Sequence, residues 1–77
     1  TNLYVGYLPP NYDDESLRSL FCPFGQIEEV KVIRDRNTGA SKGYGFVKFC
    51  DAACAVQAVH HMNGWKVEDK TLAVRVA

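Results

Sequence analysis

The sequence contains few cysteines, no long apolar run and no net charge. Its three cysteines, Cys22, Cys50 and Cys54, are an odd number without CxxC spacing, which is typical of neither a disulfide framework nor a zinc site. We interpret them as reduced side chains of an intracellular protein. Because no apolar run is long enough to span a bilayer and no signal-peptide pattern opens the chain, we expect no membrane partner.

A formal net charge of zero gives by itself no support to a nucleic-acid partner. The distribution of the charges is more informative. Up to Glu29 the chain has one cation against five carboxylates, whereas from Lys31 to Lys48 it has five cations against one carboxylate. The sequence is therefore polarised, and its positive part is centred on the stretch KGYGFVKF.

The pattern along these 77 residues predicts one domain, residues 1–77, built from strands and helices. Four segments have the composition and alternation of strands: Leu3–Leu8, Ile27–Arg34, Lys42–Phe49 and Thr71–Ala77. A helix with the 3.6-residue period is predicted after the N-cap Asp13 and ends at Pro23 and Gly25. A second helix is predicted between Asp51 and Asn63, and a short ribbon at 65–67.

The resulting order of elements is β-α-β-β-α-β. Right-handed crossovers place both helices on one face of a four-stranded antiparallel sheet, which is a ferredoxin-like two-layer α+β sandwich. The other sheet face then remains bare. By alternation its residues are Asn2, Tyr4, Gly6, Tyr44, Phe46 and Arg75.

Within KGYGFVKF, Tyr44 and Phe46 share a face with Lys42 and Lys48. Two lysines on one face indicate that this face meets water, because an unpaired buried ammonium is very costly. The first and third strands are central neighbours in this topology, so Tyr4 is expected beside the other two rings. The sequence thus predicts an exposed aromatic platform with cations at its edge.

Exposed rings edged by cations suit single-stranded RNA, because bases stack on the rings and phosphates pair with the cations. We predict nine candidate RNA-binding residues: Tyr4, Tyr44, Phe46, Lys42, Lys48, Arg75, Lys31, Asn2 and Arg36. For Lys42 and Arg36 an ordinary solvated side chain is the alternative. Burial in a core or an interface between copies is the alternative for the rings.

The segments LYVGYL and KGYGFVKF resemble the two signature segments of the RNA recognition motif family, and the resemblance extends over essentially the whole chain. It implies stacking roles for Tyr4, Tyr44 and Phe46 and a phosphate contact for Lys42. It also implies a single-stranded RNA partner and no cofactor. Two positions depart from the family: Tyr7 stands where Asn is usual, and Asp69 stands where a turn Gly is common. Asp tolerates the conformation of such a turn Gly moderately well.

More narrowly, TNLYVGYLPP, SKGYGFVKF and TLAVRVA together resemble the RNA recognition motif of plant-type branch-point-binding splicing factor one. This resemblance implies a role in pre-mRNA splicing or other mRNA processing. The location it implies is the nucleus, with the cytoplasm as a second one. We expect the domain to be a monomer.

Two other functions are compatible with this architecture. Some domains of this type bind peptides on the helical side, and the acidic helix start at 13–15 offers a surface for a basic segment, although the loop GWKVEDK lacks Arg-x-Phe. Acylphosphatases share the fold, but their anion site needs an arginine after the first strand, where this chain has YLPPNY. We therefore predict no enzyme activity and no metal site.

Overall fold

The computed structural model describes all residues from Thr1 to Ala77. A four-stranded sheet is formed by β1 (Asn2–Gly6), β2 (Ile27–Arg34), β3 (Ser41–Phe49) and β6 (Ala73–Val76). Helix α1 (Asp14–Phe21) and the short 3₁₀ helix η1 (Cys22–Phe24) connect β1 to β2, and helix α2 (Ala52–Met62) follows β3. A small ribbon is formed by β4 (Lys66–Val67) and β5 (Lys70–Thr71).

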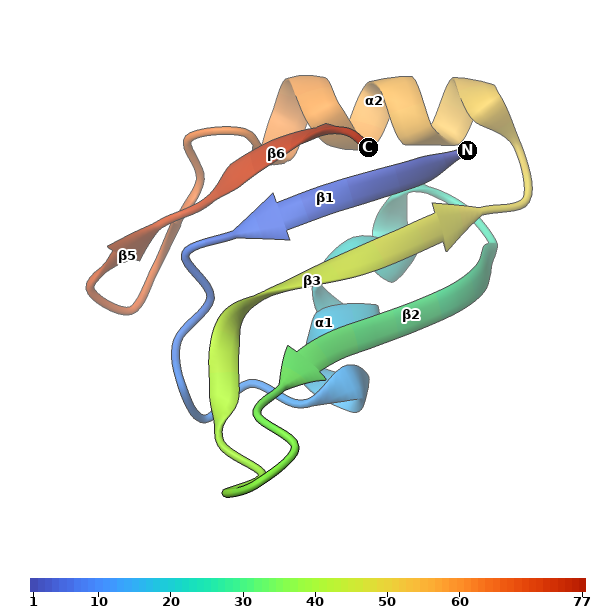
Figure 1. Ribbon diagram of the computed structural model, residues 1–77. Helices are drawn as coiled ribbons and strands as arrows, with labels where there is room; N and C mark the ends of the chain where they lie inside the picture. The colour runs from blue at the N-terminus through green and yellow to red at the C-terminus, as the bar shows by residue number, and fades with distance from the viewer.

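The sheet has the strand order β2-β3-β1-β6, and every neighbouring pair is antiparallel. Both helices lie on one side of it, behind the strands in the view of Figure 1. The predicted ferredoxin-like two-layer α+β sandwich is therefore confirmed, with β3 and β1 as the central strands. The two termini lie close together at the same end of the neighbouring strands β1 and β6, where the Ala77 amide donates to the Asn2 carbonyl at 2.9 Å.

The helix starts have the predicted caps. The Asp13 carboxylate accepts from the Ser16 amide at 2.8 Å, and the Asp51 carboxylate accepts from the Ala53 amide at 2.8 Å. The predicted end of the first helix was too late: α1 stops at Phe21, and Pro23 lies inside η1. Proline fits there because the first turn of a helix needs no amide donor from it.

The core lies between the helices and the inner face of the sheet. Fourteen buried apolar side chains form it, among them Leu3, Val5, Val47 and Phe49 of the central strands and Leu17 and Phe21 of α1. Helix α1 packs very close to β3. A Cβ added to Gly45 would lie 3.0 Å from Leu17 Cδ2 and 2.6 Å from the Lys31 carbonyl oxygen, so the absence of a side chain there allows the close approach.

Two register shifts interrupt the pairing of β2 with β3, one between Ile27 and Glu29 and one between Val32 and Arg34. Helix α1 contacts β2 beside the second shift, where the Asp14 carboxylate accepts from the Val32 amide at 2.8 Å. On β3 the same region contains Gly43, with φ +85°. Strand alternation is interrupted at this glycine, so alternation no longer places Lys42 on the same face as Tyr44.

Strand β1 ends at Gly6 and not at Leu8 as predicted, because the next residue, Tyr7, has φ +62° and leaves the extended conformation. A side chain that is neither Gly, Asn nor Asp is uncommon in this left-handed region. The turn of the ribbon holds a second case. There Glu68 has φ +55°, whereas the resemblance to the family indicated a turn conformation of this kind at the neighbouring Asp69. The predicted last strand is also split, with Leu72 between β5 and β6.

None of the helices has both the length and the apolar character needed to cross a bilayer. No group of three or more His, Cys, Asp or Glu side chains is arranged to hold a metal ion. All three cysteines are free, and Cys22 and Cys50 are exposed.

Candidate nucleic-acid interface

The bare face of the sheet is organised in cross-strand rows, because directly paired residues of antiparallel strands share a face. The Asn2 row contains Asn2, Lys48 and Glu29. The Tyr4 row contains Arg75, Tyr4, Phe46 and Lys31. The Tyr44 row contains Ala73, Gly6 and Tyr44. Seven of the nine predicted site residues therefore belong to one face.

Three half-buried rings stand at the centre of this face. Tyr4 and Tyr44 are stacked with centroids 5.8 Å apart, and Phe46 meets each of them edge-on at 6.1 Å. The predicted aromatic platform is present in the structure. Because Tyr4, Tyr44 and Phe46 keep part of their surface accessible outside the core, their remaining faces are open to a planar ligand.

Gly6 has a local role in the position of the Tyr4 ring. A Cβ at Gly6 would lie 2.8 Å from both Cε1 and Oη of Tyr4. The ring of Tyr4 thus lies over the backbone two residues further along its own strand. A glycine at this position lets the ring lie down on the sheet, where it meets Tyr44.

Arg75 covers part of the platform. Its guanidinium carbon lies 4.8 Å from the centroid of the Tyr4 ring, which is within the range of a cation–π contact. The side chain of Arg75 is exposed and belongs to the Tyr4 row. A base that approaches this face of Tyr4 therefore contacts the Arg75 guanidinium, which is both charged and planar and can itself stack on a base.

Lys48 is less free than the sequence indicated. Its Nζ lies 2.9 Å from Oε2 of Glu28, the one ion pair of the structure. The hydrogen bond to Glu28 raises the pKa of Lys48, and the same bond lowers the pKa of Glu28. Glu28 is the extra residue at the first register shift of β2. An acidic neighbour thus offsets the charge that Lys48 was predicted to offer to phosphate.

The remaining predicted cations lie at different distances from the rings. Lys31 is exposed and pairs directly with Phe46 in the Tyr4 row. Lys42 is exposed on β3, beyond Gly43. Arg36 is exposed in the loop between β2 and β3, outside the three rows. Lys31 is therefore the predicted lysine closest to the centre of the face.

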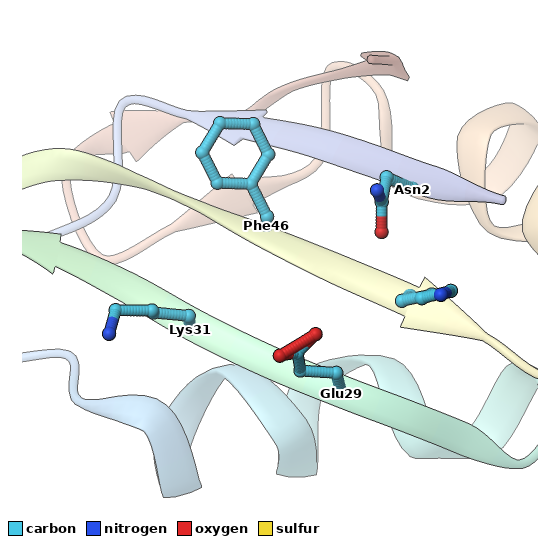
Figure 2. Close-up of a pocket in the computed structure, with 5 residues that line it drawn as sticks. Asn2, Glu29, Lys31 and Phe46 are labelled. Atoms are coloured by element: carbon cyan, nitrogen blue, oxygen red, sulfur yellow. The ribbon is translucent and has the colours of Figure 1, made fainter.

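Sequence reasoning missed Glu29 as a member of this face. Glu29 pairs with Lys48 and lines a hollow of about 190 Å³ with Asn2, Lys31, Phe46 and Lys48. Figure 2 shows its carboxylate on the same side of the sheet as the Phe46 ring. The alternation of β2 contained the signal, because Glu29 is two residues before Lys31.

A second hollow lies on the helical side of the molecule. We call it the Trp65 groove, and it has a volume of about 340 Å³. Its lining residues are Leu20, Pro23, Phe24, His61, Met62 and Trp65. The His61 ring stacks on Phe24 with centroids 5.6 Å apart. Trp65 is 53% exposed and borders the end of α2.

Comparison with known proteins gives a consistent picture. Residues 3–73 match the family model described as the RNA recognition motif. The chain is 40% identical to the Sex-lethal RNA recognition domains 1 and 2 from Drosophila melanogaster, with a TM-score of 0.96, and the match covers 100% of this chain and 49% of that one. The chain thus spans about half of the Sex-lethal chain that it matches.

Two of the matching structures contain RNA. The Sex-lethal protein/RNA complex is 40% identical with a TM-score of 0.96, covering 100% of this chain and 46% of that one. The Rna15 RRM with bound RNA (GU) is 29% identical with a TM-score of 0.90, covering 99% of this chain and 81% of that one. Since the family model spans nearly all of the sequence and an identity of 40% extends over the whole chain, the protein belongs to the RNA recognition motif family.

Proposed function

We propose that the chain binds single-stranded RNA on the bare face of its sheet, with bases stacked on Tyr4, Tyr44 and Phe46. The observation that carries the proposal is the gathering of these three rings, within 6.1 Å of one another, on a face that no helix covers. Lys42 and Arg75 are the cations that we assign to phosphate, with smaller contributions from Lys48 and Arg36, and Lys31 is assigned to the nucleotide that stacks on Phe46. Asn2 is assigned to a base edge.

The relatives support this assignment. The Sex-lethal and Rna15 structures named above hold RNA on domains with nearly the same backbone as this one. The RNA recognition motif is an RNA-binding domain and not a catalytic one, and we assign no catalytic step and no cofactor to this chain.

The expected affinity is modest. Stacking contributes roughly 1 to 3 kcal/mol per base, whereas micromolar binding requires about 8 kcal/mol. Two stacked bases are therefore insufficient, and base-edge hydrogen bonds with phosphate contacts supply the rest. For a site of about 2 to 4 nucleotides we expect a micromolar Kd and a salt slope of about −0.7 for each phosphate neutralised.

The cellular role belongs to the same proposal. The resemblance of the signature segments to those of splicing and mRNA-processing factors favours action on pre-mRNA or mRNA in the nucleus. The narrower resemblance to plant-type branch-point-binding splicing factor one stays a prediction. We also propose that residues 1–77 act as one monomeric domain.

The test is an NMR titration of the ¹⁵N-labelled protein with short random-sequence RNA and the matching DNA. The Tyr44→Ala/Phe46→Ala double variant is compared with the matched control Trp65→Ala, which removes an exposed aromatic ring from the helical side. Saturable shifts on β1, β3 and β6 that vanish in the double variant and persist in the control support the proposal. A silent sheet face at high RNA concentration contradicts it.

A second candidate is peptide binding on the helical side, and the Trp65 groove is the observation that favours it. The acidic start of α1 supports it less than the sequence suggested. Asp13 already caps α1 and Asp14 already binds the Val32 amide, so two of the three carboxylates have structural partners. Shifts confined to α1, η1 and α2 on addition of a protein ligand would favour this candidate.

A further inference from the structure

The hollow beside Phe46 differs from the rest of the proposed RNA surface in its charges. We call it the Phe46 hollow, and its lining residues are Asn2, Glu29, Lys31, Phe46 and Lys48. Figure 2 shows side chains from β1, β2 and β3 around it on the bare side of the sheet. A carboxylate inside a surface for a polyanion lowers the affinity for any phosphate nearby. A carboxylate that weakens phosphate binding can still favour RNA if it accepts hydrogen bonds from a base.

Glu29 is free to accept hydrogen bonds. The adjacent carboxylate of Glu28 takes Lys48 at 2.9 Å, and no ion pair of the structure includes Glu29. An ionised carboxylate is an acceptor only, with two oxygens that suit two parallel donors. Lys31, two residues along the same strand and opposite Phe46, is a donor only. A base stacked on Phe46 therefore meets two acceptor oxygens and one ammonium at its edge.

Among the four RNA bases, guanine has the edge that matches this set. Its N1–H and N2–H₂ groups form two adjacent donors for a carboxylate, and its O6 and N7 are acceptors for a lysine. Cytosine and adenine place one amine beside a ring-nitrogen acceptor, and uracil places one N–H between two carbonyl oxygens. An acceptor turned toward a carboxylate leaves both groups unpaired and repels, so these bases are disfavoured.

We propose that Glu29 makes the Phe46 hollow a guanine-selecting subsite, in which the ring stacks the base, the Glu29 carboxylate accepts from N1–H and N2–H₂, and Lys31 donates to O6. The inference rests on the proposed function, since it assigns a base preference to the same RNA surface. Glu29 is thus a specificity-determining residue: it weakens binding of RNA without guanine at this position and strengthens binding of RNA with it.

The test measures Kd by titration calorimetry or anisotropy for five-nucleotide uridine oligomers in which one guanosine is moved through every position. At the preferred position guanosine is then replaced by inosine, adenosine and cytidine. Inosine removes only the N2 amine, so it isolates one of the two donors. For the unaltered protein we expect guanosine to be favoured over uridine on the order of 10-fold, with inosine losing most of that preference.

The variant is Glu29→Gln, and the matched control is Glu28→Gln on the next residue of the same strand. Both remove one exposed negative charge of β2 without changing the size of the side chain. Glu29→Gln is expected to abolish the preference for guanosine over uridine and inosine. Glu28→Gln is expected to increase the affinity for all the oligomers alike and to keep their order. Two-dimensional ¹H–¹⁵N NMR spectra that match the spectrum of the unaltered protein away from the substituted residue verify that both variants are folded.

The outcomes separate the two proposals. If the unaltered protein binds every oligomer through the sheet with no preference for guanosine, or if Glu29→Gln keeps the preference, the guanine subsite is wrong while RNA binding stands. If no oligomer perturbs the sheet face at all, the proposed function fails and the subsite with it. A preference lost in Glu29→Gln and kept in Glu28→Gln supports both.

Discussion

Arg75 lies over Tyr4, with 4.8 Å between its guanidinium carbon and the ring centroid, in the row of the sheet that also contains Phe46. In the free protein the guanidinium thus occupies one stacking position. A contact of this kind at an exposed site contributes about 0.5 to 1 kcal/mol, which is less than base stacking contributes. We expect RNA to displace Arg75 from the ring and to engage it through phosphate.

The first prediction concerns the charge of Arg75. Arg75→Ala is expected to reduce RNA affinity and to make the slope of log K against log salt flatter by about 0.7, the contribution of one neutralised phosphate on a single strand. Arg75→Lys keeps the charge and should keep the slope. The measurement is Kd at four or more salt concentrations. An unchanged slope in Arg75→Ala would show that this side chain contacts no phosphate.

The second prediction concerns the position of the Tyr4 ring. Gly6→Ala places a Cβ 2.8 Å from Cε1 and Oη of Tyr4, so the ring must move, while the backbone at Gly6 needs no unusual φ. We expect nearly unchanged stability and a loss of about 1 to 3 kcal/mol in RNA binding, the contribution of one stacked base. The measurement is a double-mutant cycle with Tyr4→Ala. If the effect acts through the ring, Gly6→Ala has no further effect once Tyr4 is alanine.

The third prediction concerns the contact between α1 and β2. Asp14→Ala removes the acceptor of the Val32 amide, which is partly buried beside a register shift of β2, and is expected to cost about 1 to 3 kcal/mol of unfolding free energy. Glu15→Ala is the control, because Glu15 occupies the same first turn and makes no such bond. Urea denaturation measures both variants. Equal losses of unfolding free energy in Asp14→Ala and Glu15→Ala would mean that both carboxylates act only through their charge at the start of α1 and that the bond to Val32 contributes nothing.

The fourth prediction is a pH dependence at the Asn2 row. The bond to Lys48 lowers the pKa of Glu28, so the stabilisation from this pair is present above the unfolded value of 4.5 and is lost as pH falls through the lower folded value. The bond to Glu28 raises the pKa of Lys48, so the stabilisation that Lys48 contributes is present below the unfolded value of 10.5. It is lost as pH rises through the higher folded value. Between these limits the pair stays charged.

Accordingly, we expect the difference in RNA affinity between Glu28→Gln and the unaltered protein to stay constant from about pH 6 to pH 8, because neither partner titrates there. The sign of the difference follows from charge, because Glu28→Gln frees Lys48 to bind phosphate and therefore binds RNA more tightly. The slope of its log K against log salt is expected to be steeper by about 0.7. Titrations at three pH values measure this. A difference that changes strongly within this window would contradict the assignment of the pair.

The aromatic platform could be predicted from sequence because alternation in a strand is a local property. Tyr4, Tyr44 and Phe46 lie in regular stretches of β1 and β3, and topology then places the two strands side by side. The pairing of β2 was not predictable in the same way. Two register shifts move Glu28 and Glu29 relative to β3, and such shifts depend on contacts across the fold, such as the bond from Asp14 to Val32.

Backbone conformation at single residues was the other limit. The sequence analysis marked Tyr7 as unusual because Asn is usual there in the family, and the structure supplies the physical reason. The φ of Tyr7 is +62°, and Asn enters this region more easily than Tyr. The same reasoning named the wrong residue in the ribbon, because the left-handed position falls on Glu68 and not on Asp69. A turn type cannot be located to the residue until the flanking strands and their pairing are known.

The protein has one tryptophan, and it lies in the groove on the helical side, whereas the rings proposed to stack on RNA are tyrosine and phenylalanine on the opposite face. The tryptophan therefore belongs to the helical side, whereas Tyr4 and Tyr44, two of the four tyrosines, belong to the sheet face. Under excitation that selects tryptophan, a ligand in the Trp65 groove is expected to change the emission, whereas a ligand on the sheet is expected to leave it nearly constant. The tryptophan emission of the unlabelled protein, compared with and without ligand, thus indicates whether an unknown ligand binds the helical side.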